Sequence, residues 1–285
     1  MSVANTEQEQ YWNAEAGEKW VRYRRLLDEQ IRPLGREAME LARIGAGEQV
    51  LDVGCGCGDT TIELAARVSP GGHVLGIDIS TPMLQYAKER AEAEAVENVT
   101  FVRGDAQVYP LPKGKFHVVF SRFGVMFFSD PVAAFRNFIQ GSRPGARLAF
   151  VCWQGVTENP WMAVPLMAAL QCLPQPVDMP DPDAPGPFAF ANPDKVRRIL
   201  TEAGYERVEL HSIHRELTIG AGEPVEKVVE FLLQMGPTGK VLRSVDSSTR
   251  ARVAESVLAA LRPYEREGGV RMPGTAWIVT ARTPV

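Results

Sequence analysis

The chain has 285 residues, of which 45% are hydrophobic and 23% charged, a balance typical of a globular protein with a buried core. Its 31 Lys and Arg residues nearly balance 35 Asp and Glu residues, and a net charge of −4 without a long basic block argues against a nucleic-acid partner. No apolar run approaches the roughly 20 residues of a membrane span, no signal peptide is recognisable, and the four cysteines lack the spacing of a disulfide framework, so we expect a cytoplasmic protein without integral membrane contact.

The first part of the chain is expected to be helical. Large apolar residues recur three or four positions apart, the period of one helix face, at Trp20, Tyr23, Leu27, Ile31 and Leu34. Residues 1–45 are therefore interpreted as an N-terminal helical segment ahead of the first strand.

Strand and helix patterns alternate regularly between residues 49 and 152. Short apolar runs predict strands at 48–55, 73–80, 98–106, 116–123 and 146–153. Helical patterns fall between several of these runs, and one of them begins with Ser80 as the N-cap and Pro82 in the first turn. This alternation is typical of an α/β fold with a doubly wound, parallel sheet.

The regular alternation ends after Trp153. The patterns predict a helix at 158–173, an irregular proline-dense loop at Pro174–Pro187, a helix and a strand at 192–213, two helices within 223–266, and a last strand at 275–282. We interpret 46–153, 191–214 and 272–285 as the core of the fold. Residues 154–190 and 215–271 are expected to form a helical cap, rich in Met, Leu and Phe.

The segment LDVGCGCGDT, residues 51–60, places three alternating glycines between a strand and a helix. Such a loop brings backbone N–H groups and the positive end of a helix to one point. A P-loop requires a lysine after its last glycine, whereas Asp59 follows Gly58. A dinucleotide fingerprint requires a third glycine where Asp59 stands, which disfavours an NAD-dependent dehydrogenase. The loop favours a ligand with a positive or neutral group near Asp52 and Asp59.

Four motifs in order carry a resemblance to a known family. The first two are VLDVGCGCG at 50–58 and HVLGIDIS at 73–80, and the next two are VRGDAQVYPLP at 102–112 and FHVVFSRFGVMFF at 116–128. Together they resemble the motifs of class I methyltransferases that use S-adenosylmethionine (SAM). The stretches NVTFVRGDAQVYPLP at 98–112 and FSDPVAAFRNFIQGSRPGARLAF at 128–150 most resemble the ubiquinone/menaquinone-type small-molecule branch of that fold. The resemblance implies a seven-stranded, mostly parallel Rossmann-like sheet, here with an inserted helical cap, and SAM as the cofactor.

The resemblance also implies roles for individual residues. Asp78 would accept both ribose hydroxyls, Asp105 would meet the adenine amine and Ala106 the edge of its ring. Ser121 would lie beside the methionine part, and the N-terminal helical segment would close over the cofactor. The expected cofactor-binding residues are Tyr11, Trp20, Gly54, Cys55, Gly56, Asp78, Ile79, Met83, Asp105, Ala106 and Ser121.

Neither a metal site nor a catalytic base can be assigned from the sequence. Cys55 and Cys57 are more simply small residues whose main chain touches the cofactor, because the other two cysteines are distant in sequence. Two histidines begin core strands and two lie three apart in an extended segment, so none is nominated as a base: His73, His117, His211 and His214.

These patterns predict transfer of a methyl group from SAM to an O, N or C atom of an apolar or aromatic small molecule. The alternative is a protein of the same fold that binds SAM without methyl transfer, in a regulatory role or in another reaction. The composition of the cap helices suits equally a lid over the acceptor and the interface of a homodimer.

Overall fold

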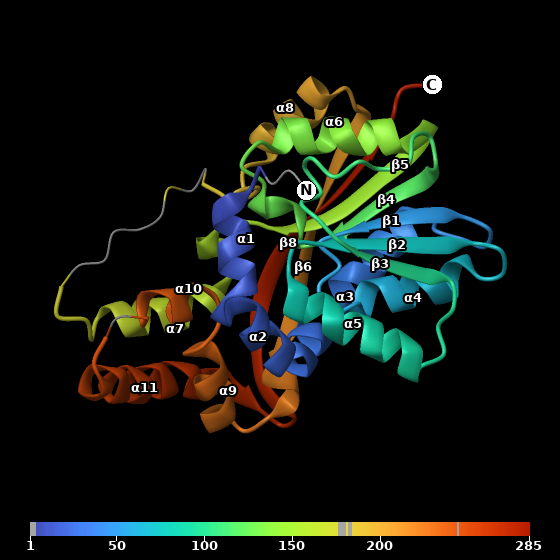
Figure 1. The fold of residues 1–285 in the computed structure, drawn as a ribbon. Coiled ribbons are helices and arrows are strands. Elements are labelled where there is room, and N and C mark those ends of the chain that lie inside the picture. Colours follow the sequence, from blue (N-terminus) through green and yellow to red (C-terminus); the bar gives the residue numbers. More distant parts are fainter. Residues whose placement is uncertain (1–3, 176–180, 182–183, 244) are drawn as a thin grey trace.

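The computed structural model describes residues 4–175, 181, 184–243 and 245–285. A central sheet has helices on both faces, and a separate group of helices lies beyond one end of the sheet (Figure 1). The strand order is β3-β2-β1-β4-β5-β8-β6. The predicted α/β class is confirmed.

The strands are β1 Gln49–Val53, β2 His73–Asp78, β3 Val99–Arg103, β4 Phe116–Arg122, β5 Ser142–Trp153, β6 Glu206–Ile219, β7 Glu265–Arg266 and β8 Gly269–Arg282. The first five strands pair in parallel, whereas β8 is antiparallel to both β5 and β6. Within the described residues the sheet has eight strands rather than the expected seven, because the two-residue β7 pairs with the edge of β8.

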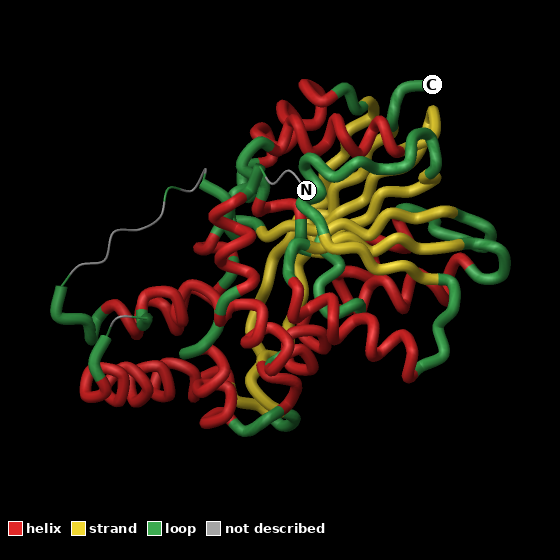
Figure 2. Tube along the Cα trace, viewed as in Figure 1, coloured by secondary structure: helices red, strands yellow, loops and turns green. Residues whose placement is uncertain are grey.

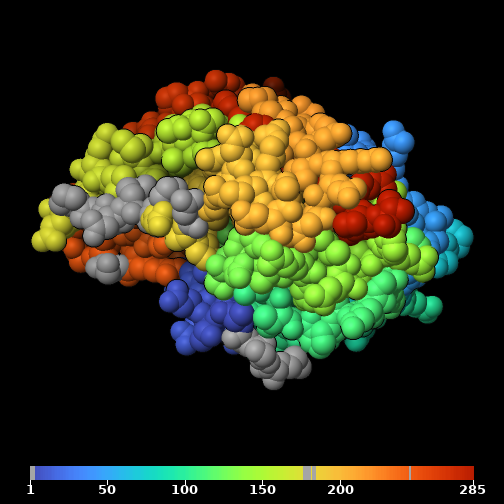
Figure 3. Space-filling view, turned by 90° about the horizontal axis from the view of Figure 1, so that it is seen from above, coloured from blue at the N-terminus to red at the C-terminus, as the bar shows by residue number. Residues whose placement is uncertain are grey.

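The helices are α1 Thr6–Asn13, α2 Glu15–Arg22, α3 Arg24–Leu41, α4 Asp59–Val68, α5 Thr81–Ala93, α6 Pro131–Gly141, α7 Pro160–Leu170, α8 Pro193–Ala203, α9 Val225–Leu232, α10 Gly236–Val241 and α11 Ser247–Leu261. Helices α3, α4 and α5 cover one face of the sheet, and α6 and α8 cover the other (Figures 1 and 2). Figure 3 shows α6, in green, and α8, in orange, side by side on that second face. Among the described residues, none of the helices has the length and apolarity that crossing a membrane requires.

The centre of the sheet is apolar on both faces, as expected for parallel strands covered by helices. Phe120 on β4 and Phe150 on β5 are completely buried. Phe135 on α6 packs against Phe150, with ring centroids 5.6 Å apart, and Phe138 of the same helix packs against Phe135 at 5.5 Å. This core fixes the ends of β1, β4 and β5, where the site is built.

The N-terminal segment is helical as predicted, but in three pieces rather than one. Ala14, with extended backbone angles, separates α1 from α2, and Tyr23 separates α2 from α3. Helices α1 and α2 lie in front of the strand ends, and α2 packs against α5 (Figure 1). The N-terminal segment is thereby brought next to the loops that follow β1 and β2.

The C-terminal half differs from the expectation in two ways. The boundary expected at residue 215 falls inside β6, because Arg215–Ile219 continues to pair with Val270–Gly274 of β8. The described part of 223–266 holds three α-helices, α9, α10 and α11, rather than two. Helix α7 packs against α11 and β8, so the long arms of β6 and β8 carry the helical group. Half of the loop predicted at Pro174–Pro187, residues 176–180, 182 and 183, lies outside the described residues.

Ser80 is the N-cap residue of α5, as predicted, but its side chain does not cap the helix. Its hydroxyl donates instead to the carbonyl of Trp12, at 2.8 Å. The hydroxyl was expected to cap the start of α5. It instead joins the N-terminal segment to the loop after β2.

Candidate functional site

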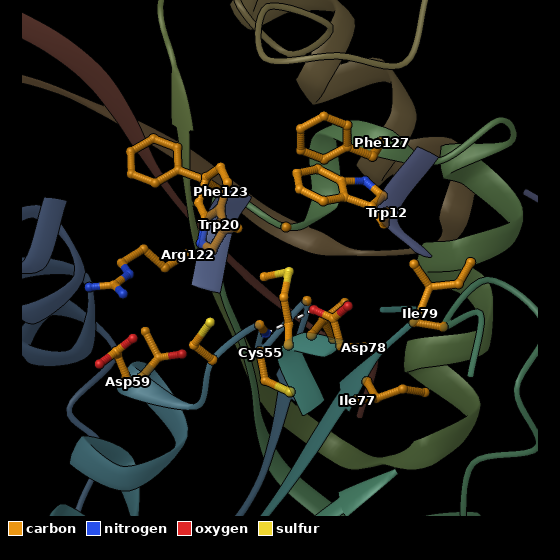
Figure 4. A pocket seen from close by; sticks show the side chains of 18 of the residues that line it. Trp12, Trp20, Cys55, Asp59, Ile77, Asp78, Ile79, Arg122, Phe123 and Phe127 are labelled. Atoms are coloured by element: carbon orange, nitrogen blue, oxygen red, sulfur yellow. Dashed lines mark hydrogen bonds between the residues drawn. The ribbon is translucent and has the colours of Figure 1, made fainter. Parts of the chain in front are cut away.

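A pocket opens at the carboxyl ends of β1, β2 and β4 and is closed from above by α1, α2 and α3. Figure 4 shows Asp78 near its middle, with Trp12 and Phe127 above it. Asp59 and Arg122 lie on one side of the pocket, and Ile77 and Ile79 lie on the other. The pocket therefore has a charged end and an apolar end.

The glycine loop forms the floor of the pocket. Gly54, Gly56 and Gly58 have φ values of +68°, +53° and +81°, a region that residues with a side chain rarely adopt. A Cβ on Gly54 would lie 2.7 Å from the Cα of Gly124, so this glycine also permits a close approach of two backbones. All three positions favour glycine, because a side chain makes this backbone conformation costly.

Asp78 ends β2 with its carboxylate in the pocket. Its Oδ2 accepts a hydrogen bond from the backbone N–H of Gly56, at 2.8 Å, and its Oδ1 accepts one from the N–H of Ser80, also at 2.8 Å. Burial raises the pKa of Asp78 above its ordinary value, against the effect of these donors. Each oxygen keeps acceptor capacity, so the carboxylate can receive two neighbouring hydroxyl groups of a ligand.

Asp52 lies beneath the glycine loop and does not line the pocket. The residue is fully buried, and its Oδ2 accepts hydrogen bonds from the hydroxyls of Thr60, at 2.7 Å, and Thr61, at 2.6 Å. Burial raises the pKa of Asp52 to about 6. This carboxylate supports the start of α4. A positive or neutral ligand group was expected near Asp52 and Asp59, and of these two residues only Asp59 lines the pocket.

Asp59 lines the charged end of the pocket and is already paired within the chain. Its Oδ1 lies 2.5 Å from Nη1 of Arg24 and 2.7 Å from Nη1 of Arg90. Burial and the nearby Asp28 raise the pKa of Asp59, against the effect of the two guanidinium groups. Arg24 also lines the pocket, so a ligand at this end meets both signs of charge.

A second ion pair stands beside the first. Nη2 of Arg122, at the end of β4, lies 2.8 Å from Oδ1 of Asp28 on α3, and both side chains are nearly buried. Burial opposes ionisation of Asp28, but Arg122 and Arg32 outweigh it and hold the pKa of this carboxyl below its ordinary value. Both members of the pair line the pocket, and the charged end therefore balances two carboxylates against two guanidinium groups.

Aromatic rings form the upper wall of the pocket and continue toward the cap. The ring of Trp12 packs edge-on against Trp20 at 5.6 Å and against Phe127 at 5.3 Å between centroids. Phe123 has a φ of +60°, unusual for a residue with a side chain, and its ring stacks on Trp153 at 4.1 Å. This stack continues to Trp161 of α7, at 5.3 Å from Trp153.

The structure brings nine of the eleven predicted site residues, all of them described, to the pocket wall: Trp20, Gly54, Cys55, Gly56, Asp78, Ile79, Met83, Asp105 and Ala106. Tyr11 is not in the wall, and its ring lies 5.1 Å from the guanidinium of Arg243 in the cap. Ser121 is also not in the wall. Its buried hydroxyl donates to the carbonyl of Val53 at 2.7 Å and so fixes the start of the glycine loop.

Sequence reasoning missed the contributions of Asn5, Gln8 and Asp28. All three residues line the pocket, and all three belong to the N-terminal segment. Asp28 follows Arg24 by four positions, so both lie on one face of α3, and an acid on an otherwise apolar helix face was the available signal. Asn5 and Gln8 precede the periodic pattern, and nothing in their local sequence indicates a site.

Cysteines and histidines contribute no reactive group that the geometry identifies. Cys57 lines the pocket, but burial raises the pKa of its thiol to about 12. No group of three or more His, Cys, Asp or Glu side chains arranged to hold a metal occurs among the described residues. The four histidines are all described and none lines the pocket.

The central part of the chain is similar in sequence to known methyltransferases. Residues 50–145 match the family model described as a methyltransferase domain. The chain is 34% identical over 116 residues to the demethylmenaquinone methyltransferase of Listeria welshimeri serovar 6b, covering 41% of this chain and 49% of that protein. It is 33% identical over 128 residues to aklanonic acid methyltransferase DauC of Streptomyces sp. strain C5, covering 45% of this chain and 58% of that protein.

A solved structure extends the likeness to most of the fold. The crystal structure of a SAM-dependent methyltransferase from Aquifex aeolicus matches with a TM-score of 0.50 and 23% identity, covering 70% of this chain and 92% of that one. The chain spans about half the length of the curated relatives that it matches. The resemblance to class I methyltransferases of the menaquinone type is confirmed for the central segment, and the fold is that of this class.

Proposed function

We propose that the pocket binds SAM and that the protein transfers its methyl group to an O, N or C atom of an apolar or aromatic small molecule. The observation that carries the proposal is the order of chemistry along the pocket. Paired charges stand at one end, an acceptor carboxylate in the middle, and apolar residues beside the internally hydrogen-bonded Asp105 at the other end. SAM has the same order, with a zwitterionic amino acid, a ribose with two neighbouring hydroxyls, and a flat base.

Each part of SAM has matching residues. Arg24 and Asp59 offer a guanidinium and a carboxylate for the amino-acid end, and Asp78 offers two oxygens for the ribose hydroxyls. Ile79 and Ala106 offer apolar contact for the base. A pyrophosphate fits less well, because the charged end holds as many carboxylates as guanidinium groups.

Bound SAM supplies a methyl group already activated on a sulfonium, which the acceptor atom takes with release of S-adenosylhomocysteine. The task left to the chain is to orient the two molecules and exclude water. The glycine loop and Asp78 fix the cofactor, while α2 and α3 close the pocket above it. Trp12 and Trp20 present aromatic faces in that wall, and such faces attract a cationic sulfonium.

The acceptor is proposed to lie where Leu27, Ile31 and Phe123 line the pocket beneath the cap. Phe123 gives this side an apolar aromatic wall, backed by Trp153 and then Trp161, which suits a planar molecule. The names of the relatives, a demethylmenaquinone and an aklanonic acid methyltransferase, support a small-molecule acceptor. We further propose that the cap acts as a lid rather than as a dimer interface.

The test is incubation of the full chain with methyl-labelled SAM and a panel of phenols, quinols and polyketides. Transfer of label to one class supports the proposal and identifies the acceptor. Binding of SAM without transfer to any member would favour the non-methylating alternative. Absence of SAM binding would contradict both.

A further inference from the structure

The carboxylate of Asp105 is occupied by the N-terminal end of the described chain. Oδ2 accepts from the backbone N–H groups of Ala4, at 2.9 Å, and Asn5, at 3.0 Å. Oδ1 accepts from Nδ2 of Asn5, at 2.7 Å, and from the N–H of Gln107, at 3.0 Å. A carboxylate has about four acceptor positions, and described residues fill all of them.

These contacts belong to a closed, buried network. Asn5, Asp105 and Gln107 are exposed to 5%, 4% and 7%. Oδ1 of Asn5 accepts from the N–H of Ser129 at 2.6 Å, and Oε1 of Gln107 accepts from the N–H of Asp130 at 3.1 Å. The network ties the N-terminal residues to the loop after β3 and to the start of α6, so a change in Asp105 releases several contacts together.

Residues 4–13, which we call the strap, are fixed at their other end as well. Asn13 donates from Nδ2 to the carbonyl of Ile79 at 3.0 Å and accepts at Oδ1 from the N–H of Thr81 at 2.8 Å. The strap therefore bridges the loops after β2 and β3, across the apolar end of the pocket. Its Gln8 and Trp12 line the pocket.

We propose that Asp105 is a positioning residue that holds the strap over the adenine end of the pocket, and that it does not read the adenine amine. The proposal rests on the proposed function, because it takes the ligand to be SAM. A carboxylate that already has four donors gains little from a fifth, whereas the strap loses its main anchor without it. Asp105 then controls how firmly the pocket is closed on every ligand that fits it.

The strap itself is tested first, without ligand, by hydrogen exchange on the full chain. Asp105→Ala and Asn5→Ala are expected to speed amide exchange in residues 6–13 by about tenfold. Glu9→Ala is the matched control, because it removes only the exposed ion pair of the strap with Arg103 and is expected to change little. Unchanged exchange in both network variants would overturn the proposal.

The second measurement compares two ligands by calorimetry: S-adenosylhomocysteine, and S-inosylhomocysteine, which carries a carbonyl in place of the adenine amine. Asp105→Ala is expected to weaken both by the same factor, about tenfold, and to leave the ratio of the two affinities as in the wild type. The double variant with Asn5→Ala should bind no more weakly than either single variant, since both break the same network.

Loss of affinity for S-adenosylhomocysteine alone would show that Asp105 reads the amine, and would overturn the proposal. If the wild type binds neither ligand, the proposed function fails, and the exchange measurement still decides the role of Asp105 in the strap.

Discussion

The two halves of the sheet are built on different principles. From β1 to β5, residues 49–153, the strands pair in parallel, β1 to β4 have five to seven residues each, and the loops at the strand ends form the floor of the pocket. Strands β6 and β8 are each 14 residues long and pair in the antiparallel direction. Their far ends carry the cap helices beyond the rest of the sheet (Figure 1). The first half is specified by local features such as glycines with positive φ. The second depends on contacts between residues far apart in the sequence.

This difference predicts which property each substitution should change. A change in the glycine loop or Asp78 is expected to affect SAM binding directly, whereas a change in the cap is expected to affect stability and the acceptor. Variants that violate this division would show that the two halves are coupled more tightly than the contacts indicate.

The largest effect on ligand affinity is expected from Gly56→Val, with a loss of affinity for S-adenosylhomocysteine of 100-fold or more. Gly56 has a φ of +53°, and a Cβ there would lie 2.7 Å from Cε of Met83 in the pocket wall. Gly114→Val is the control, because Gly114 has a φ of +61°, has open space around it and does not line the pocket. Calorimetry that shows a folded Gly56→Val with wild-type affinity would mean that the loop is only a turn.

Asp78→Ala is expected to weaken binding of S-adenosylhomocysteine by about 10- to 100-fold, because hydrogen bonds to a charged group are worth about 1.5–3 kcal/mol each. The substitution also removes the acceptor that holds the N–H groups of Gly56 and Ser80. Asp78→Asn keeps one acceptor oxygen and should bind with intermediate affinity. Equal affinities for the three proteins would exclude Asp78 from ligand binding.

Trp161→Ala is expected to separate the two halves. Trp161 is exposed to only 8%, and removing its ring should cost about 3–5 kcal/mol of unfolding free energy, measured by urea denaturation. Affinity for S-adenosylhomocysteine should change by less than about twofold, while the KM for the acceptor rises. A loss of cofactor affinity comparable with that of Asp78→Ala would break the division between the two halves.

Much of the first half could be predicted from the sequence because its signals are local. Apolar runs predict the strands β1 to β4 close to their observed starts. The glycines and the acid at the end of β2 predict the floor of the pocket. The length of β6 could not be predicted, because Arg215–Ile219 is extended only through its pairing with β8. For the same reason the boundary of the cap was placed inside a strand.

The pocket wall was predicted less completely than its floor. Asn5, Gln8 and Asp28 reach the pocket only because α1 to α3 lie over the strand ends, which is a matter of tertiary packing. Ser80 and Asp105 lie where their motifs indicate, but both bind the N-terminal segment. A motif predicts the position of a side chain better than the partner it meets.

The smaller of the two effects on stability concerns the carboxylate beneath the loop. The pKa of Asp52 is about 6 in the folded protein against an ordinary value of 3.8, so between about pH 4 and 6 the folded state binds more protons than the unfolded chain. This carboxyl therefore lowers wild-type stability as the pH rises through that window. Asp52→Asn lacks the effect, and its unfolding free energy should gain about 1–3 kcal/mol relative to wild type from pH 4 to 7. Parallel pH profiles in urea denaturation would contradict the assignment.

A calorimetric titration of the full chain with S-adenosylhomocysteine, followed by NADH, tests whether the glycine-loop half of the sheet is a SAM site. The geometry predicts saturable binding of about one S-adenosylhomocysteine per chain, because the pocket matches one amino-acid end, one ribose and one base. It predicts no heat from NADH, whose pyrophosphate would meet Asp28 and Asp59 at the charged end. Saturable binding of NADH with none of S-adenosylhomocysteine would contradict the claim.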